Sequence, residues 1–198
     1  MGKLFARLYD PIMKPFEKIK FNSIRRELLS HATGQVLEIG SGTGVNFPYY
    51  KHVDCVDAIE PNQQMIQQAK KNIASTNNVP ITIYQATAEQ LPFERNVFDS
   101  VVSTLVFCTI PDPLQALEEI RRVSKPGAPI LFFEHVRMKQ PLLAQAQDML
   151  TPAWKNICDG CHLNRDIVSF LGQAGLQVEC INPHYKGLFL MIKCTNPK

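Results

Sequence analysis

The chain has 198 residues, of which 45% are apolar and 20% charged, with a formal net charge of +3. This length suits one domain with a sizeable core, and the composition excludes a disordered, collagen-like or coiled-coil chain. Six scattered cysteines do not fit a small disulfide framework, and no apolar run approaches the roughly 20 residues of a membrane-spanning helix. The length therefore predicts a single domain, residues 1–198. The first residues lack a signal-peptide pattern, so a cytoplasmic setting is expected.

Positive charge is concentrated at the start of the chain. Residues 1–26 contain seven basic and two acidic side chains, so the rest of the chain has a small net negative charge. The body offers no basic stripe for a phosphate backbone, and we expect no nucleic-acid partner. Apolar residues are interspersed with the cations of the head, residues 1–33, which favours a helical lid or peripheral contact of residues 1–26 with an anionic membrane. The alternative is a helix that packs on the core.

Strand-like and helix-like segments alternate after the head. Short β-prone runs are expected at residues 35–39, 53–59, 81–86, 98–105 and 129–136. Helices are expected from Asn62 to about Ala74 and from Asp112 to the break at 125–127, because each begins at a capping side chain. The continuous apolar run at 98–105 is typical of a strand covered on both faces. The pattern predicts an open, doubly wound α/β fold around a mostly parallel sheet.

In such a fold, ligands bind at the carboxyl ends of the strands. The first strand ends in the glycine-rich run 40–44, and a helix is expected to begin near residues 45–46, where its N-terminus favours an anionic group. The second strand ends at Glu60, whose carboxylate can accept hydrogen bonds from both hydroxyls of a ribose. Together these features indicate a nucleoside ligand; the alternative is a tight turn beside a surface glutamate. A nicotinamide dehydrogenase is disfavoured by Val45, where its fingerprint has glycine or alanine.

Several motifs in order make this sequence similar to a known family. They are LEIGSGTG (37–44), the acid at Glu60, ATAEQLPF (86–93), FDSVVSTLVFCTIPDP (98–113) and KPGAPILFFEH (125–135). The stretch from residue 34 to 136 resembles the cofactor-binding core of class I S-adenosylmethionine-dependent methyltransferases. The resemblance implies a seven-stranded Rossmann-like sheet, in which the last hairpin, about 176–194, supplies an antiparallel strand.

The resemblance also implies a set of residues that bind S-adenosylmethionine. They are Glu38 beneath the glycine loop, Gly40, Ser41, Gly42 and Gly44 around the methionine part, Glu60, Pro61, Asn62 and Met65 near the ribose, Thr87, Ala88 and Glu89 along the adenine, and Leu105 beside the reactive methyl.

The second half of the chain narrows the resemblance. Residues 134–136 and TPAWKNICDGCHLNR (151–165) are similar to the thiol S-methyltransferases of the methyltransferase-like group, which also resemble phospholipid N-methyltransferases and quinone C-methyltransferases. This implies a small lipophilic acceptor, with a thiol as the first candidate and a phospholipid or quinone as the alternatives. Residues 137–165 are expected to form a helical insert over the acceptor pocket, followed by a helix and hairpin over 166–198.

Four side chains are candidates for the acceptor side of the site. His135 follows the fifth strand and is a candidate catalytic base, because histidine titrates near neutral pH; a structural histidine is the alternative. Trp154, Asp159 and Arg165 are candidates for the acceptor pocket. Their alternatives are packing for Trp154 and an ion pair between Asp159 and Arg165.

The cysteines do not predict a metal site. Cys158 and Cys161 form a C-x-x-C pair, but zinc needs further ligands and no second pair is spaced for it. We therefore expect reduced thiols and no metal. Cys108 follows the fourth strand and is expected to be a core residue.

Overall fold

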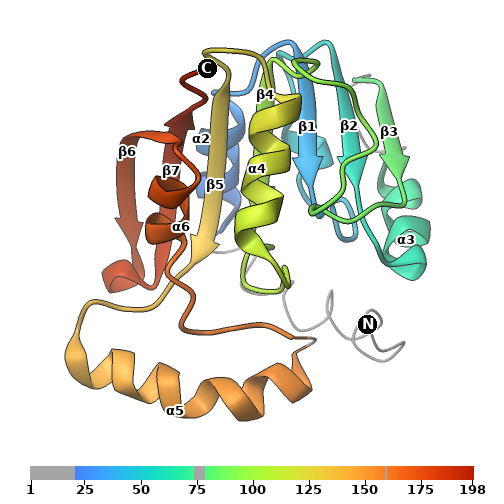
Figure 1. Ribbon diagram of the computed structural model, residues 1–198. Coiled ribbons are helices and arrows are strands. Elements are labelled where there is room, and N and C mark those ends of the chain that lie inside the picture. The colour runs from blue at the N-terminus through green and yellow to red at the C-terminus, as the bar shows by residue number, and fades with distance from the viewer. Residues whose placement is uncertain (1–20, 74–78, 159) are drawn as a thin grey trace.

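A computed structural model describes residues 21–73, 79–158 and 160–198, and its centre is a seven-stranded sheet in the order β3-β2-β1-β4-β5-β7-β6 (Figure 1). The strands are β1 (Gln35–Ile39), β2 (Cys55–Ile59), β3 (Ile81–Tyr84), β4 (Ser100–Thr104), β5 (Pro129–His135), β6 (Gln177–His184) and β7 (Phe189–Thr195). Strands β1 to β5 pair in parallel, and β7 pairs antiparallel to both β5 and β6. This confirms the predicted doubly wound α/β fold and its antiparallel C-terminal hairpin.

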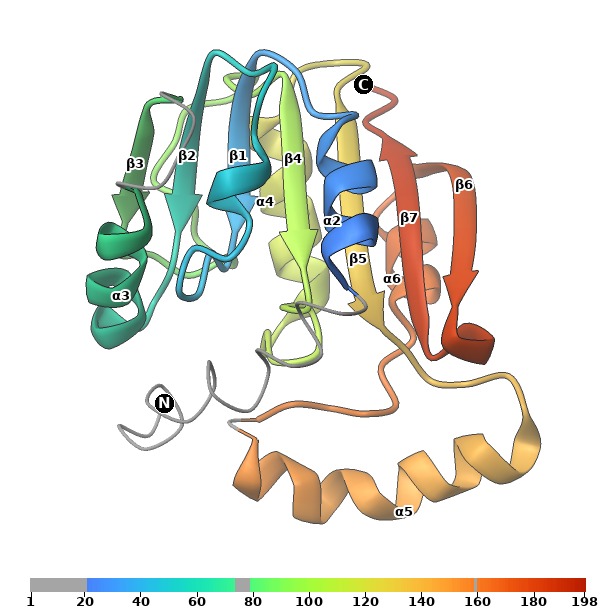
Figure 2. The same ribbon diagram turned by 180° about the vertical axis from the view of Figure 1, so that it is seen from behind.

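Helices cover both faces of the sheet. They are α2 (Asn22–Leu29), the short 3-10 helix η2 (Phe47–Tyr49), α3 (Gln63–Ile73), α4 (Pro113–Val123), α5 (Pro141–Ile157), α6 (Ile167–Gln173) and η3 (Tyr185–Gly187). Helices α2 and α3 lie on one face, and α4 and α6 on the other (Figure 2). The expected caps are present, since the Asn62 side chain accepts from the Gln64 N–H at 2.8 Å and Asp112 from the Gln115 N–H at 3.1 Å.

Each face of the sheet has its own apolar core. Leu117 and Ile120 of α4 and Leu171 of α6 are completely buried against one face. Leu28 of α2 and Phe47 of η2 are buried against the other. Because both faces are covered, the central strands are buried along their whole length, which explains the continuous apolar run that predicted β4.

The segment after the glycine loop differs from the prediction. A helix was expected to begin near residues 45–46, but only the three-residue η2 forms there. Phe47 and Tyr50 are both fully buried, and Tyr50 has an extended backbone. Insertion of these two rings into the core turns the chain inward before a helix can continue.

The head and the insert occupy different parts of the molecule. The predicted lid and membrane contact fall mainly on residues 1–20, outside the described residues. Within the described part, α2 packs on the sheet next to β5, as in the packing alternative. The predicted helical insert is α5, which runs past the carboxyl ends of the strands (Figures 1 and 2). Among the helices described, none is long and apolar enough to cross a membrane.

Candidate functional site

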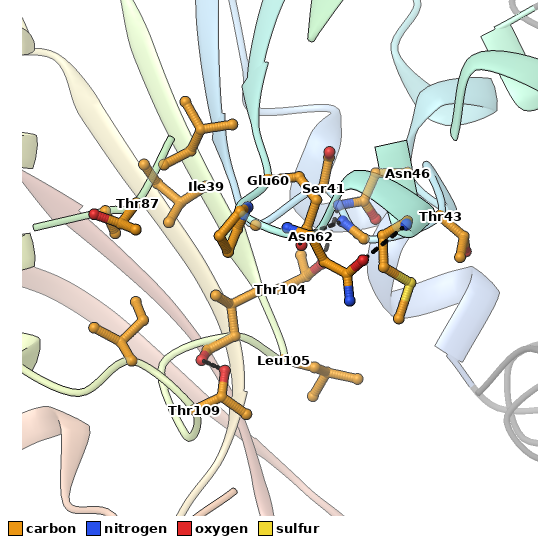
Figure 3. Close-up of a pocket in the computed structure, with 18 of the residues that line it drawn as sticks. Ile39, Ser41, Thr43, Asn46, Glu60, Asn62, Thr87, Thr104, Leu105 and Thr109 are labelled. Carbon is orange, nitrogen blue, oxygen red and sulfur yellow. Dashed lines mark hydrogen bonds between the residues drawn. The ribbon is translucent and has the colours of Figure 1, made fainter. Parts of the chain in front are cut away.

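A cavity of about 660 Å³ lies where β1, β2 and β4 end. Its wall is made of the last residues of these strands, the loops that follow them, the segment after β3, and one side chain each from α2 and α3. Figure 3 shows Ser41, Glu60 and Asn62 on one side and Thr104, Leu105 and Thr109 along another. The predicted residues that line it are Gly40, Ser41, Gly42, Glu60, Pro61, Asn62, Met65, Thr87, Ala88, Glu89 and Leu105. Sequence reasoning therefore located about half of this wall.

The glycines of the loop have different physical roles. Gly42 has φ +54°, and a Cβ built there meets no atom within 4 Å, so its missing side chain keeps the cavity open. A Cβ on Gly40 would lie 2.6 Å from Val106, and one on Gly44 would lie 2.6 Å from the Phe47 ring. Gly44 does not line the cavity. Gly42 thus allows a ligand to approach, whereas Gly40 and Gly44 allow close packing.

Glu60 joins the ends of the first two strands. Its carboxylate accepts from the Gly42 N–H at 3.0 Å and from the Asn62 N–H at 2.9 Å, and its side chain is buried. A carboxylate oxygen has two acceptor positions, so this arrangement suits the predicted contact with ribose hydroxyls. Ser41 Oγ, also in the wall, is buried and has no hydrogen-bond partner among the described residues.

A buried polar network lies at the floor of the cavity, and the sequence analysis missed most of it. Arg25 Nη1 donates to Asn46 Oδ1 and Thr104 Oγ1, both at 2.7 Å. Asn46 Nδ2 and the Tyr50 hydroxyl donate to the Glu38 carboxylate, each at 2.9 Å. Glu38 therefore lies beneath the loop, as predicted, and outside the cavity wall. Burial raises its pKa to about 7, against the opposing effects of the two hydrogen bonds and the Arg25 charge.

Arg25, Asn46 and Thr104 could not be found from sequence spacing. Residues 21 and 79 positions apart meet here through tertiary packing. Arg25 places a permanent positive charge in the cavity, which suits a carboxylate ligand. Arg25 was visible in the sequence only as one of the basic residues of the head, and nothing in its spacing indicated a place in the cavity.

Glu134 holds the loop that follows β4. Its carboxylate accepts from the N–H groups of Val106 at 3.0 Å and Phe107 at 3.2 Å, and from Ser103 Oγ at 3.0 Å. Complete burial raises the Glu134 pKa to about 7, although these hydrogen bonds act in the opposite direction. Leu105, at the start of the loop, has φ +58°, a strained backbone conformation for a bulky residue. The fold thus imposes the shape of this part of the wall.

Of the four acceptor-side candidates, the three that the structure describes do not line this cavity. His135 Nε2 lies 3.3 Å from Cys161 Sγ. Trp154 is 40% exposed on α5, and Asp159 falls outside the described residues. Arg165 Nη2 lies 2.9 Å from the Nδ1 atom of His162, and Arg165 lines a second, shallower hollow beside α4 and α6.

His135 instead belongs to a cluster with Cys108 and Cys161. The pKa of the Cys161 thiol is lowered, first by its hydrogen bond with the Cys108 thiol and then by His135. The same hydrogen bond, together with burial, raises the pKa of Cys108. Cys108 lies in the 105–110 loop, so the cluster is directly behind the wall of the cavity.

Comparison with known proteins identifies the family to which this chain belongs. Residues 37–132 match the family described as a methyltransferase domain. Thiol S-methyltransferase TMT1B of Rattus norvegicus is 34% identical over 95% of this chain and 79% of its own length. The chain belongs to the S-adenosylmethionine-dependent methyltransferases. This membership replaces the nicotinamide alternative.

Other similar proteins act on different acceptors or show the fold alone. Phosphatidylethanolamine N-methyltransferase of Cereibacter sphaeroides is 32% identical over 62% of this chain and 63% of its own length. A crystal structure of a putative methyltransferase from Bacillus halodurans has a TM-score of 0.75 at 17% identity, and the match covers 89% of this chain and 100% of that one.

The residues of the cavity fit the methyl donor. Gly42 leaves room for it, Glu60 can accept from ribose hydroxyls, Arg25 can pair with its carboxylate, and the buried Ser41 hydroxyl can donate to it. When bound, S-adenosylmethionine supplies a methyl group on a positively charged sulfur, which an electron-rich acceptor atom can take. The loop at 105–111 forms one part of the cavity wall. The protein therefore contributes mainly the positioning of donor and acceptor.

Proposed function

We propose that this methyltransferase transfers the methyl group to the sulfur of a small lipophilic thiol. The observation that carries the proposal is the chemistry of the cavity wall. Its ionisable side chains among the described residues are Arg25, Glu60 and Glu89, and no histidine, cysteine, lysine or tyrosine lines it. The wall at 105–111 is largely apolar, with Leu105, Val106 and Ile110 facing the cavity, which suits a lipophilic acceptor.

The absence of a histidine, cysteine, lysine or tyrosine from the described part of this wall favours sulfur over nitrogen, oxygen or carbon. An amine, a phenol or a carbon acid needs a group with a pKa near the working pH to take its proton. A thiol reacts as its thiolate, a few per cent of which forms near neutral pH without help. The predicted base, His135, contacts Cys161 rather than the cavity. The thiol S-methyltransferases of rat, human and mouse, at 34 to 36% identity, support the same acceptor class.

An acceptor panel tests this proposal. The full chain is incubated with labelled S-adenosylmethionine and, separately, an alkyl thiol, phosphatidylethanolamine vesicles or a reduced quinone. We expect label in the thioether product alone. The Gly42→Leu variant, whose side chain would enter the donor cavity, provides the background rate. Transfer to the phospholipid or the quinone with none to the thiol would refute the proposal, and would favour the alternatives suggested by the relatives named for those substrates.

We also propose that the enzyme meets lipophilic acceptors at an anionic membrane, contacted peripherally through residues 1–26 apart from Arg25, whose side chain is buried at the cavity floor. The excess of basic residues in this segment supports the proposal. So does α5, on which Leu142 is 82% and Met149 75% exposed. Co-sedimentation with vesicles tests it: binding should require anionic lipid, fall with salt, and weaken in the Lys14→Glu/Lys18→Glu variant. Equal binding by this variant and the unaltered chain would contradict the proposal.

A further inference from the structure

Three potential metal ligands from distant parts of the sequence meet behind the cavity wall. The Sγ atoms of Cys108 and Cys161 and a ring nitrogen of His135 all lie within 4.8 Å of one another. Cys108 comes from the loop after β4, His135 from the end of β5 and Cys161 from the segment after α5. The C-x-x-C spacing concealed this group, because only Cys161 of that pair takes part.

The donor set matches zinc, and one of its separations already falls in the range that zinc requires. Zinc binds cysteine sulfur at about 2.3 Å and histidine nitrogen at about 2.0 Å in tetrahedral geometry, which places ligand atoms roughly 3.3 to 3.8 Å apart. His135 Nε2 already lies 3.3 Å from Cys161 Sγ. Imidazole together with thiolate also selects against magnesium and calcium, which prefer oxygen ligands.

Main-chain contacts hold two of the ligands in place. The His162 N–H donates to the Cys108 carbonyl oxygen at 2.9 Å, and the Cys161 N–H donates to the Cys158 carbonyl oxygen at 2.9 Å. Arg165 Nη2 also approaches the Cys108 carbonyl, at 3.5 Å. The segment at 160–165 is therefore attached to the loop after β4. His135 is fixed independently, at the end of a central strand paired with β7.

We propose that Cys108, His135 and Cys161 bind a zinc ion whose fourth position takes the sulfur of the acceptor thiol. Three protein ligands and one open position are the pattern of catalytic zinc sites, whereas structural sites are closed by four. The loop that carries Cys108 also forms the cavity wall through Leu105, Val106, Thr109 and Ile110. A metal at the cluster thus lies next to the methyl donor's cavity.

Metal coordination would ionise the thiol without a histidine, cysteine, lysine or tyrosine in the described part of the cavity wall. A thiol that coordinates zinc loses its proton to solvent as the sulfur–metal bond forms. Zinc and two cysteine thiolates sum to zero charge, so a third thiolate makes the site negative, and the Arg165 guanidinium beside Cys108 offsets that charge. This second role rests on the proposed thiol acceptor, whereas metal binding by the three side chains does not.

Metal content and cobalt spectroscopy test the site without an activity assay. The full chain, purified with a phosphine reductant, should contain about one zinc ion per chain by mass spectrometry. Replacement by Co²⁺ should give a thiolate-to-cobalt absorption band. Cys161→Ser and His135→Gln should lower zinc affinity by more than about 100-fold, the upper end of what outer-sphere partners alone contribute. Cys158→Ser is the matched control, three residues from Cys161 and also half-buried, and should bind zinc normally.

The open position is tested on the cobalt form. Adding butane-1-thiol should shift the absorption band and release about one proton per site, whereas butan-1-ol should do neither. Wild-type protein without zinc and without a cobalt band would overturn the site, whatever the folding of the variants. A normal cobalt band that butane-1-thiol leaves unchanged would overturn the thiol-binding role. Thiol methylation by verified metal-free enzyme at the full rate would also overturn that role while leaving the proposed function standing.

Discussion

Replacing Glu134 by glutamine should make the fold less sensitive to rising pH while leaving the cavity wall in place. The folded protein raises the Glu134 pKa from 4.5 to about 7, and each pKa unit corresponds to about 1.4 kcal/mol. Below pH 4.5 the group is protonated in both folded and unfolded chains. As the pH rises from 4.5 toward 7, Glu134 ionises in the unfolded chain before it does in the folded protein. The free energy of unfolding therefore falls by about 3 kcal/mol over this range and is constant above it.

The loop contacts predict why glutamine is tolerated and alanine is not. The glutamine carbonyl can accept from the N–H groups of Val106 and Phe107, and its amide can donate to Ser103 Oγ. Glutamine does not ionise, so the pH dependence caused by the Glu134 carboxyl group is lost. Glu134→Ala leaves two buried N–H groups unpaired, at about 1 to 3 kcal/mol each.

Urea unfolding near pH 5 and near pH 8 measures both effects. Between these conditions Glu134→Gln should lose about 2 to 3 kcal/mol less stability than the unaltered chain, while Glu134→Ala should be destabilised at both. Glu38, whose pKa is also about 7, adds its own decline to every variant and cancels from the comparison. The reasoning is refuted if Glu134→Gln follows the decline of the unaltered chain, or if it is as unstable near pH 5 as Glu134→Ala.

Three further substitutions test the cavity. Gly42→Leu should abolish the thermal stabilisation by S-adenosylmethionine, because the leucine side chain enters the cavity. Gly127→Leu, also at positive φ with open space around it, should keep this stabilisation. Equal loss in both variants would contradict the assignment of the cavity to the methyl donor. Glu60→Ala should weaken the binding of S-adenosylmethionine, measured by calorimetry, roughly tenfold to a hundredfold, as expected for lost hydrogen bonds to a charged group. Unchanged affinity would exclude the ribose contact. Leu105→Gly should lower methyl transfer, since the wall loses a side chain that also packs against the core. Unchanged transfer would contradict a role for this side chain in the wall.

About half of the cavity wall was determined by the sequence itself. Glycine at position 42, an acid at the end of the next strand and a buried apolar run at β4 are local features that can be recognised without the fold. Because the carboxyl ends of parallel strands meet at one edge, knowing which segments were strands was enough to bring Gly42, Glu60 and Leu105 to one cavity.

Only the tertiary structure decided which distant side chains meet. Arg25 reaches the cavity floor because α2 packs on the sheet, and Cys108, His135 and Cys161 meet because the segment after α5 returns to the loop behind β4. The same packing directed His135 to a cysteine instead of the cavity and shortened the helix expected after the glycine loop. The spacing of residues along a chain predicts which of them share a face or an end of one strand or helix. Contacts between elements depend on how their apolar faces are buried together, and no local pattern encodes that.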